Sequence, residues 1–186
     1  MVRYLYTKLK GVSLIEVMLT VFIALLLLLI TYSIFNLSQH TKRSIEDRVE
    51  LVQNQRAIVD RLFRELRQAN AIVTSLPSNE ILFEDGHGNL DNLPIQYLRY
   101  YLDGANLYRE ARYYSFAASP DTHVFYDEVD EFGSLPNVTI VENRLIGEYI
   151  AWLQFIGDGT ITIGLTFTKN NQTITLTSNV APRNLK

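Results

Sequence analysis

The sequence contains no cysteine, and this absence removes several classes of protein at once. Without thiols the chain has no disulfide scaffold, no thiolate zinc site, no iron–sulfur cluster and no cysteine nucleophile. Histidine is scarce, and the three copies (His40, His87 and His123) are too far apart in sequence for a local metal motif. The chain also lacks a Gly-x-Ser-x-Gly elbow, a phosphate-binding loop and a dinucleotide fingerprint. We therefore expect no catalysis, no metal site and no cofactor.

Polar side chains are missing from the centre of an apolar run that covers residues 12–35. Residues 21–30 contain none and include five consecutive leucines. As a helix, residues 12–35 would be about 36 Å long, enough to cross a hydrocarbon core of about 30 Å. A buried core helix is the alternative, but such a helix is rarely apolar on every side in a chain of this size. The run therefore predicts one transmembrane helix.

Acidic residues are absent from residues 1–11, which carry Arg3, Lys8 and Lys10. The positive-inside tendency keeps this end in the cytoplasm and places the rest of the chain outside the cytoplasmic membrane. Without these three charges the formal net charge changes from −3 to −6. So acidic an exported part argues against nucleic acid as a partner.

One ionisable residue, Glu16, lies inside the apolar run, one turn from its start. A carboxylate in a membrane helix costs about 2.5–3.5 kcal/mol at the bilayer centre and less near the interface. Two interpretations stay open at this point: hydration in the headgroup region, or a function. A cleaved signal peptide fits poorly, because the run is longer than a typical apolar signal region and no Ala-x-Ala-like site follows it.

The N-terminal residues form a recognisable order: a basic leader, Lys10-Gly11, then Val12-Ser13-Leu14-Ile15-Glu16-Val17 and the apolar helix. This order resembles the prepilin processing site of the type IV pilin superfamily, which includes pilus subunits and the pseudopilins of type II secretion. The resemblance implies cleavage by a prepilin peptidase between Gly11 and Val12, followed by methylation of the Val12 amine. Glu16 would then be the fifth residue of the mature chain.

The resemblance also implies a role for Glu16 in assembly. After cleavage Val12 carries a free amine in an apolar setting, where an unpaired amine and an unpaired carboxylate are both costly. If subunits stack with an axial offset, Glu16 meets the Val12 amine of a neighbour and fixes the register. The implied partners are the prepilin peptidase, other pilin or pseudopilin subunits, the inner-membrane assembly platform and, before assembly, membrane lipid.

Residues 36–73 contain neither proline nor glycine and continue the helix with a different pattern. Charged residues occupy one side, and Asp60 and Arg64 have the i,i+4 spacing of a helical ion pair. A helix from Val12 to near Ile72 would be about 90 Å long. A coiled coil is the alternative for this second half. The apolar residues that recur at helical spacing are Ile45, Val49, Val52, Val59, Leu62, Phe63, Leu66 and Ala69.

Residues 74–186 read as β-structure, beginning after Pro77, which ends any continuation of the helix. The clearest signal is the last one, in which apolar residues alternate with threonine on both sides of a turn at residues 169–172. We expect residues 45–73 to pack across an antiparallel sheet. The resulting fold class is α+β. The expected strands lie in residues 81–83, 95–101, 106–115, 138–141, 148–156, 161–167 and 174–180.

The head also resembles a part of the superfamily. The helix end LFRELRQANAIV, the run IQYLRYYLDGANLYREA and the final hairpin ending SNVAPRN are similar to the larger minor pilins and minor pseudopilins. In many major pilins the apolar helix contains glycine and proline, whereas Leu25 and Ser33 stand at the corresponding positions here. This departure also favours a minor subunit. The sequence does not separate a pilus from a secretion system.

Two acidic segments and one aromatic segment have alternative uses. Residues 84–92 place Asp85, Asn89 and Asp91 like the start of a calcium loop, but lack its glycine and bidentate glutamate, so we expect a turn. Residues 126–132 hold four acids, which we expect to form a solvated, mobile excursion within 119–136 rather than a calcium site. The tyrosines and arginines of residues 97–114 suit single-stranded nucleic acid or, more in keeping with the charge, contact with neighbouring subunits.

We expect a structural subunit with four segments: a leader (1–11), a transmembrane and filament-core helix (12–35), an amphipathic helix (36–73) and a β-sheet head (74–186). It would cross the cytoplasmic membrane once and later enter a cell-surface pilus or a periplasmic pseudopilus. The alternative is a single-span, membrane-anchored extracytoplasmic binding protein that never polymerises. A membrane-anchored enzyme is a third possibility.

Overall fold

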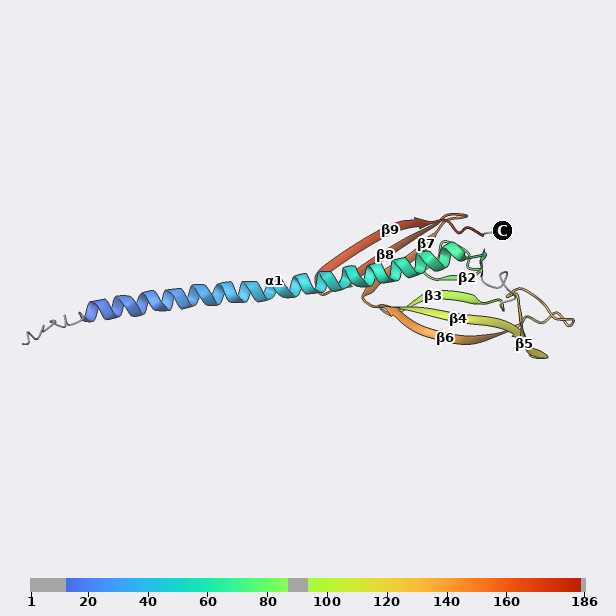
Figure 1. Ribbon diagram of the computed structural model, residues 1–186, viewed down its shortest axis with the longest axis horizontal. Helices are drawn as coiled ribbons and strands as arrows, with labels where there is room; N and C mark the ends of the chain where they lie inside the picture. Colours follow the sequence, from blue (N-terminus) through green and yellow to red (C-terminus); the bar gives the residue numbers. More distant parts are fainter. Residues whose placement is uncertain (1–12, 87–93, 185–186) are drawn as a thin grey trace, which may run out of the picture. The chain divides into compact units, whose positions relative to one another are not determined.

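The computed structural model describes residues 13–86 and 94–184. It confirms an α+β fold, with one long N-terminal helix followed by antiparallel sheets (Figure 1). The chain divides into two compact units, Met1–Ile45 and Glu46–Lys186, which are considered separately. The elements are α1 (Leu14–Gln68), β1 (Ala71–Ile72), β2 (Ile81–Glu84), β3 (Tyr97–Asp103), β4 (Asn106–Phe116), β5 (Ser119–Val124), β6 (Asn137–Gly147), β7 (Ile150–Ile156), β8 (Ile161–Lys169) and β9 (Gln172–Val180).

Helix α1 ends at Gln68, earlier than the boundary near Val73 that we predicted. Residues 71–73 are apolar and partly β-branched, and Ala71 and Ile72 pair with β2 instead of continuing the helix. The freed carbonyl groups of the last turn find other donors. The Arg183 N–H donates to the Arg67 carbonyl at 3.0 Å, so the C-terminal segment caps the helix.

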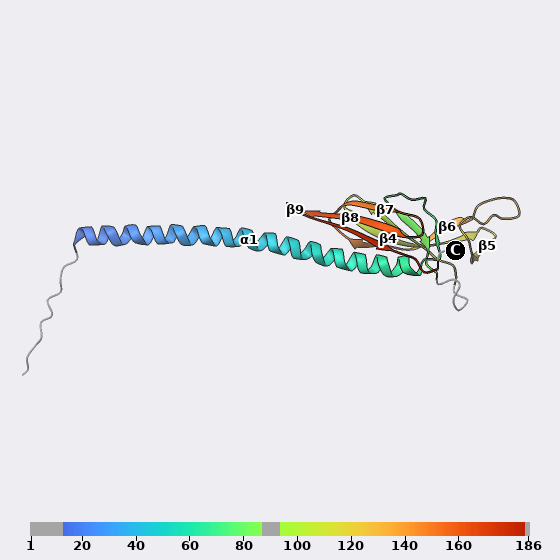
Figure 2. The same cartoon turned by 90° about the horizontal axis from the view of Figure 1, so that it is seen from above.

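Two antiparallel sheets form the second unit, where the sequence suggested a single sheet. Strands β1 to β6 form one sheet, in which β4 pairs with β3, β5 and β6. Strands β7, β8 and β9 form the other. The sheets diverge, and the last turns of α1 lie along the opening between them (Figures 1 and 2). Figure 2 turns the same molecule by 90°.

One core joins the helix to both sheets. The fully buried helix residues are Leu51, Ile58, Leu62 and Leu66, and the sheets contribute side chains such as Phe83, Tyr100, Phe155 and Phe167. A coiled coil, the alternative for this half of the helix, is not what the structure shows, because these residues are buried against strands of the same chain. Gly147 permits the close approach of β6, since a Cβ there would lie 2.1 Å from Ile58 Cδ1.

The predicted apolar stripe was partly wrong. Ile45 and Val49 are 58% and 49% exposed, whereas Leu51 and Ile58, which we did not include, are buried. Val59 and Phe63 pack at the margin of the core. Two adjacent stripes of apolar residues make this face of the helix broad, and the position of the two sheets decides which stripe becomes its centre.

The predicted C-terminal hairpin is confirmed, and β3 and β4 form a second hairpin. Asp103 pairs with Asn106 around a two-residue loop in which Gly104 has a φ of 60°. Lys169 pairs with Gln172 around Asn170, whose φ of 50° belongs to the left-handed region that asparagine tolerates. Strand β5 was not predicted, and residues 119–124 belong to it rather than to a surface excursion.

Strand β6 has one free edge. Among the described strands it pairs only with β4, and residues 137–145 are all exposed. It runs opposite to α1, because Gly147 meets Ile58 while Glu142 shares Arg109 with Glu65, two turns further along the helix.

Candidate functional site

The two predicted processing residues, Gly11 and Val12, lie outside the described residues. The third predicted site residue, Glu16, lies in the first turn of α1. The Ser13 N–H donates a hydrogen bond to Glu16 Oε2 at 3.0 Å. Ser13-x-x-Glu16 therefore forms the glutamate half of a capping box, in which the glutamate side chain reaches back to satisfy a free N–H at the helix start, while the Glu16 N–H donates to the Ser13 carbonyl at 3.0 Å.

The capping box is readable from the sequence, but neither interpretation given for Glu16 above included it. It supplies a third role for this carboxylate, besides hydration and assembly. The hydrogen bond from Ser13 uses only part of the Glu16 carboxylate, because an ionised carboxylate has two oxygens and about four acceptor positions. Glu16 can thus cap its own helix and accept a further donor.

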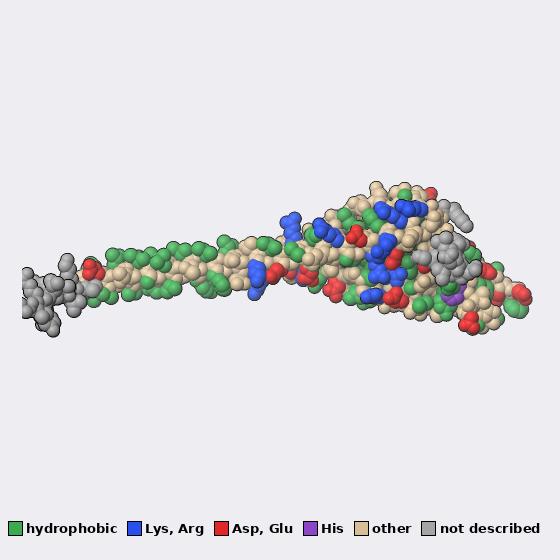
Figure 3. All heavy atoms as spheres, viewed as in Figure 1, with side chains coloured by type: hydrophobic (Ala, Val, Ile, Leu, Met, Phe, Trp, Pro, Cys, Tyr) green, Lys and Arg blue, Asp and Glu red, His purple; other side chains and the backbone are tan. Residues whose placement is uncertain are grey.

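The apolar part of α1 is long enough and apolar enough to cross a bilayer, and this is compatible with a single-pass membrane anchor. None of its most apolar 18-residue window is buried. Figure 3 shows this part of the helix covered with hydrophobic side chains. Its hydroxyl groups are satisfied internally, since Thr31 and Ser33 donate to the Leu27 and Leu29 carbonyls at 2.8 and 2.9 Å.

In the second unit, Glu65 holds α1 on the six-stranded sheet. Its carboxylate accepts hydrogen bonds from Tyr100 Oη at 2.5 Å and from Arg109 Nε at 2.9 Å. Arg61 donates to the same group at 3.2 Å, so the i,i+4 ion pair of this region is Arg61–Glu65 and not the predicted Asp60–Arg64. Arg109 also binds Glu142 at 2.9 Å, which ties β6 to the same cluster.

The surroundings of Glu65 raise the pKa values of Tyr100 and Arg109. Burial, then the neighbouring Glu65 carboxylate, raises the pKa of the Tyr100 phenol far above its ordinary value. For Arg109, burial opposes the charge, but the hydrogen bond and the charge of Glu65 outweigh it and raise the pKa. Tyr100 and Arg109 therefore both keep their protons at neutral pH. This arrangement suits a structural clamp rather than proton transfer.

The tyrosines and arginines of β3 and β4 do not form one open surface. Tyr97, Tyr100 and Tyr114 are buried, whereas Tyr101 and Tyr108 stack on each other with ring centroids 5.7 Å apart. Arg99 covers Tyr101 at 4.5 Å from the ring centroid. The faces of these rings are already used by neighbouring side chains, which leaves little room for stacked bases.

The acidic segment folds into a turn between β5 and β6. Asp130 Oδ1 accepts hydrogen bonds from the Phe132 and Ser134 N–H groups at 2.9 and 2.8 Å. Phe132 and Leu135 are 91% and 68% exposed. Within the described parts of the chain, no three His, Asp or Glu side chains are grouped to hold a metal ion. In the other calcium-like segment, residues 87–93 lie outside the described residues.

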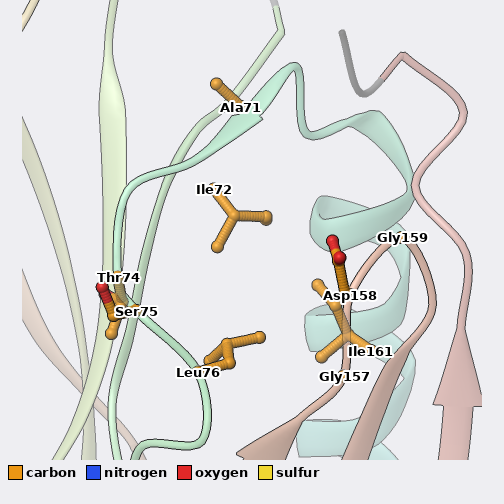
Figure 4. Close-up of a pocket in the computed structure, with 9 residues that line it drawn as sticks. All are labelled: Ala71, Ile72, Thr74, Ser75, Leu76, Gly157, Asp158, Gly159 and Ile161. Atoms are coloured by element: carbon orange, nitrogen blue, oxygen red, sulfur yellow. The ribbon is translucent and has the colours of Figure 1, made fainter.

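A cleft of about 710 Å³ lies between the segment after α1 and the β7–β8 turn (Figure 4). Ile72, Leu76 and Ile161 point into it, and Asp158 is the one ionisable residue among those lining it. Thr74 and Ser75 add hydroxyl groups, but the lining contains no histidine or lysine that could activate a hydroxyl group as a nucleophile.

A search of protein-family models finds no match to this sequence, and a search of curated proteins finds none either.

Proposed function

We propose that this protein is a structural subunit of the type IV pilin superfamily, a minor pilin or a minor pseudopilin. It is made as a precursor in the cytoplasmic membrane, cut by a prepilin peptidase after Gly11, and assembled into a filament through its N-terminal helix. The observation that supports this most directly is the single helix α1, which is apolar on all sides at first and is then packed on antiparallel sheets. The leader motif supplies the processing signal.

The physical logic of assembly follows from the exposed helix. Residues 14–35 expose their apolar side chains, which lipid covers in the membrane and other helices cover in a filament. Removal from lipid therefore requires immediate contact with neighbouring subunits. Glu16 accepts one bond from Ser13 and has acceptor positions left for the Val12 amine of a neighbour.

The first measurement is the N-terminal mass of the protein from its native membranes. A chain that begins at Val12, with a methylated amine, is the expected result. An intact Met1 would refute processing and favour the non-polymerising anchored binding protein.

Two variants then separate assembly from helix capping at Glu16. Glu16→Ala removes the cap and the charge, whereas Glu16→Gln keeps a side chain able to complete the capping box but removes the charge. We expect both variants to insert into the membrane and both to lose filament assembly by tenfold or more. Normal assembly of Glu16→Gln would limit Glu16 to capping. Glu148→Gln, on the head, is the matched control.

Neighbouring genes distinguish the two kinds of filament. A retraction ATPase would indicate a pilus, and a secretin accompanied by general-secretion components would indicate a pseudopilus.

A further inference from the structure

Three arginines gather at the end of α1. Arg64 and Arg67 lie on the last turns of the helix, and Arg183 is brought beside them because its N–H caps the Arg67 carbonyl at 3.0 Å. Asn184 Nδ2 reinforces this attachment with a 3.5 Å contact to the Gln68 carbonyl. Together with Phe63 they line an open groove of about 460 Å³, which we call the arginine groove.

Three arginines and one acid line the arginine groove, so positive charge is in excess there. Among the described residues no ion pair involves Arg64, Arg67 or Arg183, and Asp60 is the single acid that lines the groove. Four other arginines of the head are paired: Arg61 and Arg109 with Glu65, Arg99 with Glu80, and Arg112 with Glu110. Arg48 and Arg56 have no ion pair among the described residues either, but neither lines the groove. A cleft lined by one sign of charge attracts the opposite charge, and guanidinium groups match carboxylates in geometry.

The same unit carries a projection of complementary chemistry, residues 125–136, which we call the acidic loop. Its tip is ordered by Asp130, which accepts the Phe132 and Ser134 N–H groups, so that Phe132 projects with 91% of its surface exposed. Asp127 and Glu131 both precede Phe132 in the acidic loop. An exposed aromatic side chain that follows carboxylates in the same loop is the chemical counterpart of a groove formed by Phe63 and three guanidinium groups.

We propose that the acidic loop of one copy of this chain docks in the arginine groove of a second copy. Phe132 packs against Phe63, while Asp127 and Glu131 face Arg64, Arg67 and Arg183. The two surfaces are different, so the contact is heterologous. Both surfaces lie toward the end of the head where α1 stops, so parallel neighbours with a small axial offset bring them together (Figure 1). This inference depends on the proposed function in one respect only: assembly into a filament is what places neighbouring copies parallel to each other.

The absence of cysteine makes a direct test clean. Full-length Phe132→Cys and Arg64→Cys proteins, carrying different tags, are produced together in the native host, and their membranes and filaments are treated with a short bismaleimide cross-linker. We expect a covalent dimer that contains both tags. Phe132→Cys paired with Thr175→Cys, on the exposed side of β9, is the matched control and should give at least tenfold less dimer. Equal cross-linking of the control pair, or cross-linking of Phe132→Cys to a different protein, would overturn the proposal.

Exchanging the charges of the two surfaces adds a second test, because an unfolded variant could lose the cross-link but would not regain it when the partner's charges are reversed. With the cross-linking pair in place, Arg67→Glu and Arg183→Glu should lower the dimer yield by tenfold or more. Adding Asp127→Arg and Glu131→Arg should restore at least half of it. A loss without restoration, in proteins whose Trp152 fluorescence shows unchanged unfolding, would refute the charge pairing.

The N-terminal mass of the same samples keeps the two proposals apart. Processed chains without a cross-link would refute the docking contact alone. Cross-linked chains that retain Met1 would refute the proposed function alone.

Discussion

Residues 14–45 and 46–68 belong to one helix, yet their apolar side chains have opposite environments. In the first part Leu26, Leu27 and Leu28 are 43%, 59% and 65% exposed, whereas in the second part Leu51, Leu62 and Leu66 are completely buried. The helix is regular throughout, so local backbone preference does not distinguish the parts. What differs is the partner: the second part has sheets of its own chain, and the first has none among the described residues. The start of the folded head is therefore marked by the burial of the apolar side chains of α1 and not by a change in its helical backbone.

The largest expected effect comes from truncating a leucine in the packed part. Leu62→Ala removes a fully buried side chain from the core, and should lower the free energy of unfolding of the head by about 2–5 kcal/mol. Leu27→Ala makes the same chemical change in the exposed part and should alter it by less than about 0.5 kcal/mol. Urea unfolding of the full chain in detergent, followed by the fluorescence of its single tryptophan, measures both. Equal losses of unfolding free energy in Leu62→Ala and Leu27→Ala would contradict the difference between the two parts of the helix.

A second variant tests whether polar contacts also hold the packed part. Glu65→Ala leaves Arg109 and Tyr100 without their shared acceptor, and should cost about 3 kcal/mol of unfolding free energy. The exposed Glu148→Ala should change it by less than about 0.5 kcal/mol. The same unfolding measurement applies. A loss below about 1 kcal/mol would mean that the cluster reorganises around water.

Alkaline titration tests whether buried tyrosines of the head make its stability depend on pH. Burial raises the pKa of Tyr97 to about 12 from its ordinary value of 10.0, although the hydrogen bond from the Tyr126 N–H opposes the shift. Below pH 10 both folded and unfolded states keep the proton, so stability is complete. Between pH 10 and 12 the unfolded state alone releases it, and stability falls by about 1.4 kcal/mol per pH unit for this group.

The raised pKa values of Tyr100 and Lys169 act in the same direction and steepen the loss. Tyr97→Phe should reduce the alkaline slope, measured as unfolding free energy against pH. Leu27→Ala, which removes no titratable group and lies in the exposed part of α1, should leave the slope unchanged. If Tyr97→Phe left the dependence of unfolding free energy on pH unchanged, Tyr97 would not be the cause of the alkaline loss of stability.

The smallest expected effect marks where the packed part begins. Lys169, at the β8–β9 turn, contacts Glu50 at 2.5 Å and Asp47 at 3.6 Å. Lys169→Met should speed amide hydrogen exchange in residues 47–51 and leave exchange near Leu62 unchanged. Slower or uniform exchange would show that this turn does not fasten the helix. Thr173→Val, also near the turn, is the control.

Much of the fold was predictable because its signals are local. Hydropathy and the absence of glycine and proline predicted the helix, and alternation on both sides of residues 169–172 predicted the last hairpin. The division into two sheets has no local signal, since it depends on which strands find partners. The apolar stripe of the helix was misplaced for the same reason, because Leu51 and Ile58 are selected by strands far away in sequence.

Less of the candidate functional sites than of the fold was predictable from the sequence. Glu16 stands out in an apolar run, and its capping partner Ser13 is readable from the same four residues. The Glu65 cluster is not readable, because it joins residues separated by 35 and 44 positions. The arginine groove depends on the C-terminal segment returning to the helix end, which no periodicity encodes.

The free edge of β6 has a consequence for aggregation. An exposed strand edge is a template for other strands, and two β6 edges brought together antiparallel would extend the sheets of two molecules into one. Such a pair is related by a two-fold axis perpendicular to the strand, which also reverses the direction of α1, because β6 and α1 run opposite ways in each copy. Two helices inserted in one bilayer from the same side cannot take opposite directions. The single-pass anchor that we propose would therefore prevent the pairing for which the free edge of β6 is otherwise suited, and a head cut free of that anchor would be expected to lose this protection.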